Sequence, residues 1–257
     1  METMKLVTVT NISILNDLRE YHDIRLVYPL KSFCVGYDVE FDIEQIDDFV
    51  LVNRILDDSD LDKLEDVLKL SHINGIVFDD LGIIDIVKDL NITKILLLDH
   101  LATNTVSINY YLDYVDSVVV SNDLTEEEIR EIVNNSKKPL VVNVFGLKTL
   151  MYSRRRLLTN YQTFHNLDNE NNITASIDDK KFRIVENEYG TKFYANNYYN
   201  ATSLLDLDNV LYFWYDPIFL DNEKIKSVVL NNNLDGINVD PLFLDKATVY
   251  KVGDLDA

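Results

Sequence analysis

Short apolar runs alternate with helix-length segments from Lys5 to Val144, and this alternation limits the possible folds more than any other feature. The runs are rich in β-branched residues and apolar at every position, as in Ile95–Leu98, which suits strands buried on both faces of a parallel sheet. Seven strands are predicted, at Leu6–Val9, Ile24–Val27, Phe49–Val52, Gly75–Phe78, Ile95–Leu98, Ser117–Val120 and Pro139–Val144.

An eighth unit follows at Val210–Trp214, with a helix predicted from Asn222 to Leu230. Eight βα units favour a closed barrel over an open doubly wound sheet, and helix-length crossovers require parallel strands. We therefore predict an α/β fold of the (β/α)8 TIM-barrel type.

The stretch from Asp168 to Asn200 breaks the alternation because it is polar. Within it, Phe182–Val185 and Lys192–Ala195 flank Glu188-Tyr-Gly190, as the strands of a hairpin flank a glycine turn. The prediction is a single barrel domain over residues 1–257 with a β-hairpin insertion at 168–200.

Three helix starts carry capping signals. Thr125–Glu128 reads as a capping box with acids in the first turn, and Ser59–Asp62 and Asp42–Gln45 are weaker versions of the same pattern.

The composition limits the class of protein. The chain has 44 acidic and 24 basic residues and a formal charge of −20, so we expect neither nucleic acid nor a membrane as partner. Cys34 is the one cysteine and cannot supply a thiolate cluster, and the histidines lack metal-site spacing, so no metal and no cofactor are expected. With no secretory leader and no apolar run of about 20 residues, a cytoplasmic location is expected.

One basic island interrupts this acidity. Residues 132–167 contain no acid, while six basic residues lie there: Lys137, Lys138, Lys148, Arg154, Arg155 and Arg156. Arginines can hold a carboxylate or phosphate in bidentate fashion, so Arg154 and Arg156 are predicted to bind an anion. The alternative is that they pair with acids of the chain itself.

Polar residues follow most predicted strands, and in a βα barrel the strand C-termini converge on one face. Together with the island, they define the predicted ligand-binding residues: Asn53, Asp79, Asp99, His100, Asn143, Tyr152, Ser153, Arg154 and Arg156. The alternative for Asp79, Asp80 and Asp123 is that they cap helix N-termini. His100 could act as a proton shuttle or serve as a hydrogen-bonded structural residue.

No catalytic residue can be assigned. Ser153 has no evident base and no surrounding Gly-x-Ser-x-Gly elbow, so we expect little or no proteolysis.

The segment from Val141 to Thr159 resembles the signature of the U32 peptidases, also called collagenase-like peptidases. That signature runs Glu-x-Phe-x-x-Gly-small-x-Cys-x-small-aromatic-Ser-Gly-x-Cys-x-Leu-Ser. Four positions match it: Gly146, Tyr152, Ser153 and Leu158. Four depart from it: Val141 replaces Glu, Thr149 and Arg156 replace the two Cys, and Arg154 replaces the second Gly. Flanking segments also resemble the family: Gly75–Gly82, Val118–Ile129 and Phe243–Lys251.

The chain is similar in particular to short U32-like proteins of low-GC Gram-positive bacteria and mollicutes, with a Ser-Arg-Arg core. The resemblance implies a hydrolase of the peptidase class. Some members of the wider family are linked to hydroxylation of RNA bases or quinones with an iron–sulfur cluster, which this chain lacks the cysteines to hold.

Two hypotheses remain open. The first is a site at the barrel mouth for an anionic small molecule or a peptide carboxylate. The second is a non-catalytic subunit that docks on a longer, cysteine-containing U32 paralogue, or on a second copy of itself, through the hairpin. A defined pocket with perturbed titration would favour the first hypothesis, and an exposed apolar patch would favour the second.

Overall fold

The structure, a computed structural model, describes residues 4–178 and 180–246. Part of the segment Phe243–Lys251 therefore lies outside the described residues. The predicted barrel is confirmed: eight parallel strands form a closed ring, because the last of them pairs with both the first and the seventh. The ring consists of β1 (Lys5–Thr8), β2 (Ile24–Pro29), β3 (Phe49–Val52), β4 (Gly75–Phe78), β5 (Thr93–Leu97), β6 (Ser117–Val120), β7 (Leu140–Ser153) and β11 (Val210–Asp216).

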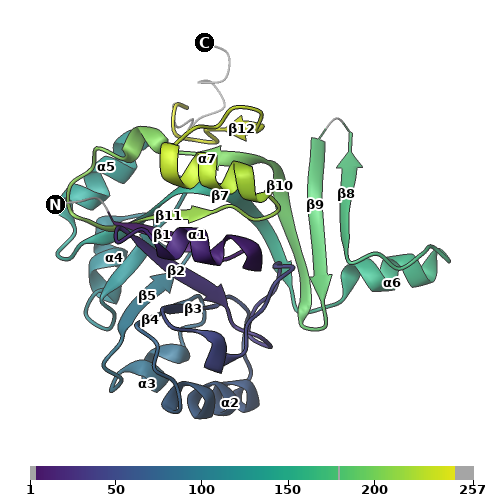
Figure 1. Cartoon of the computed structure of the whole chain (residues 1–257), viewed down its shortest axis with the longest axis horizontal. Coiled ribbons are helices and arrows are strands. Elements are labelled where there is room, and N and C mark those ends of the chain that lie inside the picture. The colour runs from purple at the N-terminus through teal and green to yellow at the C-terminus, as the bar shows by residue number, and fades with distance from the viewer. Residues whose placement is uncertain (1–3, 179, 247–257) are drawn as a thin grey trace.

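Helices lie around the outside of this ring (Figure 1). They are α1 (Leu15–Arg19), α2 (Asp58–Lys69), α3 (Ile83–Val87), α4 (Thr105–Tyr111), α5 (Glu126–Asn135) and α7 (Asn222–Asn231), with short 3-10 turns at η1 (Ile12–Ile14), η2 (Ile43–Gln45) and η3 (Thr202–Leu204). No described helix combines the length and the apolar character needed to cross a membrane.

Alternation along the strands divides the core into two layers. Leu6, Val77 and Trp214 belong to the cluster inside the ring, while Val7 and Phe78 belong to the larger cluster between ring and helices. Every residue of β3, β4 and β6 is buried. The continuous apolar runs of the sequence therefore reflect strands covered on both faces.

Two of the three predicted helix starts are confirmed. Thr125 caps α5 through a reciprocal capping box with Glu128, and Asp42 and Gln45 form one at η2. The prediction at Ser59 was wrong, because Asp57 caps α2 by accepting a hydrogen bond from the Asp60 amide. The serine lies inside the helix, and its hydroxyl donates to the same Asp57 carboxylate.

The connection from β2 to β3 differs from the predicted βα pattern. It contains only the 3-10 turn η2 instead of a covering helix. Gly36 and Tyr37, in this loop, pack close to Tyr194 of the hairpin: a Cβ built on Gly36 would lie 2.1 Å from the Tyr194 Oη. Gly36 has a φ of +99°, which a residue with a side chain rarely adopts, so the close approach depends on glycine.

Beyond the ring, β7 continues past the barrel and pairs antiparallel with β10 (Gly190–Asn200). The sheet continues through β9 (Lys180–Asn187) to β8 (Asn172–Ile177), and the short β12 (Val239–Asp240) pairs with β10. Figure 1 shows β9 and β8 standing beside the barrel, with α6 (Leu157–Phe164) at their lower end. The predicted hairpin corresponds to β9 and β10; β8, α6 and the continuation of β7 were not predicted.

Glu186 joins α6 to this sheet. Its buried carboxylate accepts hydrogen bonds from the Leu158 amide at 2.7 Å, the Thr159 amide at 3.0 Å and the Thr191 hydroxyl at 2.5 Å. These amides belong to the first turn of α6, where no intrahelical acceptor exists. The carboxylate therefore fixes the start of the helix against β10.

Replacing Glu186 by Ala should lower the free energy of unfolding by about 2 to 4 kcal/mol, because buried donors would lose a charged acceptor. Chemical denaturation followed by circular dichroism measures this change. Glu188→Ala, at an exposed position on the same hairpin, should change the stability little. Equal effects of the two substitutions would contradict the assigned role of Glu186.

Candidate functional site

A cavity of about 200 Å³ lies at the C-terminal end of the barrel strands. We call it the mouth cavity. Its walls come from the ends of β3 to β7 and β11, from the β2–β3 loop and from β10. The side chains that line it are Tyr37, Leu51, Asn53, Asp79, Leu97, Asp99, His100, Asn122, Asn143, Leu147, Thr149, Leu150, Met151, Tyr152, Lys192, Tyr194, Trp214 and Asp216.

Six of the predicted site residues line this cavity. They are Asn53, Asp79, Asp99, His100, Asn143 and Tyr152. Four of them, Asn53, Asp79, Asp99 and His100, follow barrel strands, and Asn143 lies on the barrel part of β7. The convergence of strand ends thus brings together residues that are far apart in sequence. Asn53 also has a structural role, because its amide group exchanges hydrogen bonds with the Val35 backbone at 2.8 and 3.2 Å.

The structure places the other three predicted residues outside the cavity wall. Arg154 pairs with Asp57 at 3.1 Å, and the Nε of Arg156 lies 3.6 Å from the Glu186 carboxylate. The hydroxyl of Ser153 accepts a hydrogen bond from the Arg155 amide at 3.1 Å. The arginines thus follow the alternative interpretation, in which acids of the chain itself pair with the basic island.

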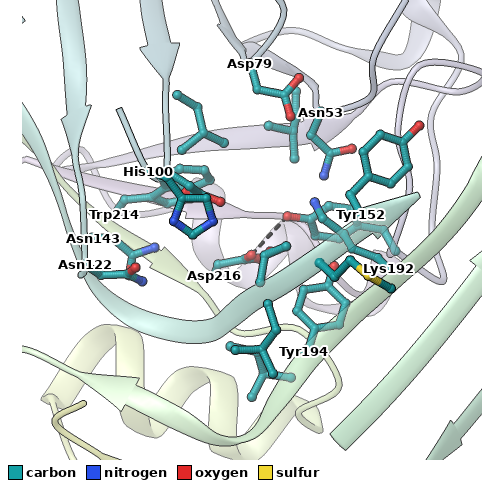
Figure 2. A pocket seen from close by; sticks show the side chains of 18 residues that line it. Asn53, Asp79, His100, Asn122, Asn143, Tyr152, Lys192, Tyr194, Trp214 and Asp216 are labelled. Atoms are coloured by element: carbon teal, nitrogen blue, oxygen red, sulfur yellow. Dashed lines mark hydrogen bonds between the residues drawn. The ribbon is translucent and has the colours of Figure 1, made fainter. Parts of the chain in front are cut away.

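Lys192 is the main residue that the sequence analysis missed. It lies on β10, directly opposite Tyr152 of β7, and shares its strand face with Tyr194. Lys192 is only 8% exposed, and among the described residues no carboxylate lies within 4.0 Å of its ammonium group. Its Nζ lies 5.9 Å from the centre of the Tyr194 ring. Figure 2 shows Lys192, Tyr194, Asp79 and Asp216 around the same cavity.

Two carboxyl groups of the cavity have pKa values raised toward neutral pH. Burial raises the pKa of Asp79 to about 7; Lys192 opposes this shift, and the charges of Asp99 and Asp80 add to it. Burial likewise raises the pKa of Asp216 to about 6, although a 2.9 Å hydrogen bond from the Tyr37 hydroxyl favours the ionised form. Both groups can therefore carry a proton under mildly acidic conditions and donate it in a hydrogen bond.

Three oxygen atoms in the cavity wall are buried and accept no hydrogen bond from the described residues. They are the Oδ1 atoms of Asp79, Asn143 and Asp216. Buried polar atoms are nearly always paired in proteins, so unpaired ones in a cavity wall indicate groups that face a ligand or solvent.

His100 stands at the edge of the cavity and is oriented by Asp123, not by the neighbouring Asp99. Its Nδ1 lies 2.7 Å from one oxygen of Asp123, and Lys148 lies 2.6 Å from the other. Burial acts against the ionised form of Asp123, but Lys148 and His100 hold the pKa of that carboxyl below its usual value. The imidazole is fixed at one nitrogen and keeps the other for a further contact.

The alternative role of Asp79, Asp80 and Asp123 as N-caps of helices is not observed. The N-cap residues of α3 and α5 are Gly82 and Thr125. Asp80 instead accepts hydrogen bonds from the Leu56 and Gly82 amides, both at 2.9 Å, and so holds two loops together. Asp79 remains directed to the cavity, as Figure 2 shows.

Cys34 is fully buried, and burial raises the pKa of its thiol far above the usual value, as an inert thiol requires. Within residues 4–178 and 180–246, no three His, Cys, Asp or Glu side chains are grouped so that they could hold a metal ion.

Comparison with known proteins finds one family whose profile matches the chain. The profile of peptidase family U32 matches residues 44–200, more than half of the chain. Over 96 residues the chain is 25% identical to an uncharacterized protease of Methanocaldococcus jannaschii; the matched stretch covers 36% of this chain and 24% of that protein. The chain therefore spans only about a quarter of the length of that relative. No solved structure matches the chain with comparable significance.

The raised pKa of Asp79 predicts a pH-dependent stability. Between its unfolded pKa of 3.8 and its folded pKa of about 7, the folded carboxyl keeps a proton that the unfolded chain has lost. The contribution of Asp79 to the free energy of unfolding should therefore fall as the pH rises through this range, by about 1.4 kcal/mol for each unit of pKa difference.

Asp79→Asn should remove this loss of stability. The variant should unfold at higher denaturant concentration than the wild type at about pH 8, and the difference should shrink at about pH 4. Asp62→Asn, at an exposed position on α2, serves as control. The same stability difference between Asp79→Asn and the wild type at both pH values would contradict the assignment.

Proposed function

This chain belongs to peptidase family U32, and we propose that its mouth cavity binds an anionic small molecule or the carboxylate of a peptide. The observation that carries this proposal is the position of Lys192, a largely buried lysine in the wall of the cavity. A lysine in that setting loses part of the hydration of its charge unless an anion or a set of hydrogen-bond acceptors compensates. Because no described carboxylate lies within 4.0 Å of it, a ligand anion is the fitting partner.

The acids around Lys192 support this choice in their protonated forms. Asp79 and Asp216 have pKa values of about 7 and 6, so each can lose its negative charge in mildly acidic solution. A protonated carboxyl no longer repels an anion and can donate a hydrogen bond to it. Binding of an anion should therefore be accompanied by proton uptake.

The geometry supports a binding role more directly than peptide hydrolysis. The Ser153 hydroxyl contacts the Arg155 backbone, and His100 contacts Asp123, so the described hydrogen bonds do not link this serine to a base. This pattern fits a member of the short Ser-Arg-Arg group with a degenerate signature. Thr149, at a signature cysteine position, lines the cavity, and Val141, at the signature glutamate position, is buried inside the barrel.

Replacing Lys192 by Met should weaken the binding of butanoate or phosphate at least about tenfold, because a charge-assisted hydrogen bond contributes roughly 1.5 to 3 kcal/mol. Isothermal titration calorimetry measures the dissociation constant. In the wild type, affinity should rise as the pH falls from about 8 to about 6, since Asp79 takes up a proton in that range.

Lys181→Met is the matched control, because Lys181 is an exposed lysine of the neighbouring strand β9. It should bind the same anions as the wild type. Equal weakening in both variants would indicate a general effect of net charge and would contradict a site at Lys192.

The second candidate function is the partner subunit, and an exposed apolar surface on α6 favours it. Phe164 is 81% exposed, and Tyr161 and Leu167 beside it are also exposed. In Figure 1 this helix projects at the edge of the hairpin sheet, where a second chain could reach it.

Native mass spectrometry of the protein isolated from its own host tests this alternative. A complex with a second U32 chain, identified by peptide sequencing and lost in Phe164→Ser, would support it. A monomer that carries a small anion would support the ligand site instead.

A further inference from the structure

A second recess of about 500 Å³ opens beside the mouth cavity. We call it the outer recess. It shares five wall residues with the mouth cavity: Asp79, Leu97, Asp99, His100 and Tyr152. The two spaces therefore adjoin, and one molecule can occupy both.

The outer recess has an apolar rim, which is formed by side chains from neighbouring βα loops. Three successive βα loops each contribute one large aliphatic side chain: Ile55 follows β3, Leu81 follows β4 and Leu101 follows β5. These side chains are 53%, 44% and 58% exposed. Single exposed apolar residues are common on protein surfaces, but three in neighbouring loops around one recess form a patch.

We propose that the outer recess binds an aliphatic or aromatic group of the same ligand whose acidic end lies at Lys192. This inference rests on the proposed function and narrows its ligand to carboxylates that carry an apolar group. The free acid of an alkyl chain and the C-terminal end of a peptide with an apolar residue share this chemistry.

Three acids line the recess, Asp79, Asp80 and Asp99, and the positions of the first two are compatible with such a ligand. Asp80 is held by two backbone amides of its own loops and is thereby fixed in place. Asp79 lies on the wall shared with the mouth cavity, so it can contact the acidic end of the ligand. The apolar group then needs only the outer rim, away from Lys192.

Calorimetric titration of a series of carboxylates from acetate to hexanoate, at about pH 6, tests the inference. Each methylene transferred from water to an apolar site contributes about 0.8 kcal/mol, or roughly a fourfold gain in affinity. Hexanoate should therefore bind the wild type at least about tenfold more tightly than acetate. The affinity for acetate reports on the anion site, and the gain along the series reports on the outer recess.

Two variants separate these contributions. Leu101→Ser should reduce the gain along the series severalfold and leave acetate binding unchanged, whereas Lys192→Met should weaken all members by the same factor. Leu70→Ser serves as control, because Leu70 is 82% exposed at the end of α2 and lies outside the recess. It should behave as the wild type.

The outcomes are distinguishable. Equal affinities of acetate and hexanoate for the wild type would overturn the apolar subsite and leave the anion site intact. Absence of binding by every carboxylate, or binding that Lys192→Met leaves unchanged, would overturn the proposed function itself. A wild-type dimer in sedimentation velocity that Leu101→Ser dissociates would assign the rim to a second copy of the chain and would also overturn the inference.

A comparison of octanoate with acetyl-Gly-Leu identifies the source of the ligand. Tighter binding of the peptide would indicate a peptide carboxylate, and tighter binding of octanoate a free alkyl acid. Either preference upholds the shared chemistry. Acetyl-Gly-Leu amide, which lacks the charge, should bind at least about tenfold more weakly than the free peptide, and equal binding would contradict an anchor at Lys192.

Discussion

The site depends on one long strand, β7, whose first half belongs to the barrel and whose second half pairs with the hairpin. The first half of β7 closes the barrel between β6 and β11, and its second half pairs antiparallel with β10. This shared strand carries the hairpin sheet to the barrel mouth and sets Lys192 directly opposite Tyr152. Without the continuation of β7, the cavity would lack the wall formed by β10 and would be a ring of strand-end acids and amides with no lysine among them.

The chemistry of the cavity follows from a lysine and two acids that line the same space without forming ion pairs. Lys192 lies close enough to Asp79 and Asp216 to oppose the rise in their pKa values, yet it pairs directly with neither. A closer arrangement would have produced a structural ion pair with no capacity for a ligand. The observed arrangement leaves one ammonium group and two protonatable carboxyls facing a common space, and a bound anion can satisfy all three.

The sequence was sufficient to predict the barrel, and several polar residues that it places at strand ends line the mouth cavity. Asp79, Asp99, His100 and Asn143 were found because strand C-termini converge in any parallel barrel. Lys192, Tyr194 and Tyr37 were missed, because a hairpin and a helix-free loop bring them there through tertiary pairing. The spacing of Lys192 and Tyr194, two apart on one predicted strand, was the available signal. Arg154 and Arg156 lie next to Asp57 and Glu186, and charge spacing along the chain does not show that these acids come close to them in the fold.

The central claim is that the ammonium group of Lys192 itself contacts an anion. An NMR spectrum of protein labelled with ¹⁵N at the lysine side chains observes that group directly. On addition of butanoate at about pH 6, we expect one ammonium signal, absent from Lys192→Met, to shift saturably while the other lysine signals stay in place. Small, parallel shifts of all lysine signals, with no distinct response from Lys192, would contradict the account.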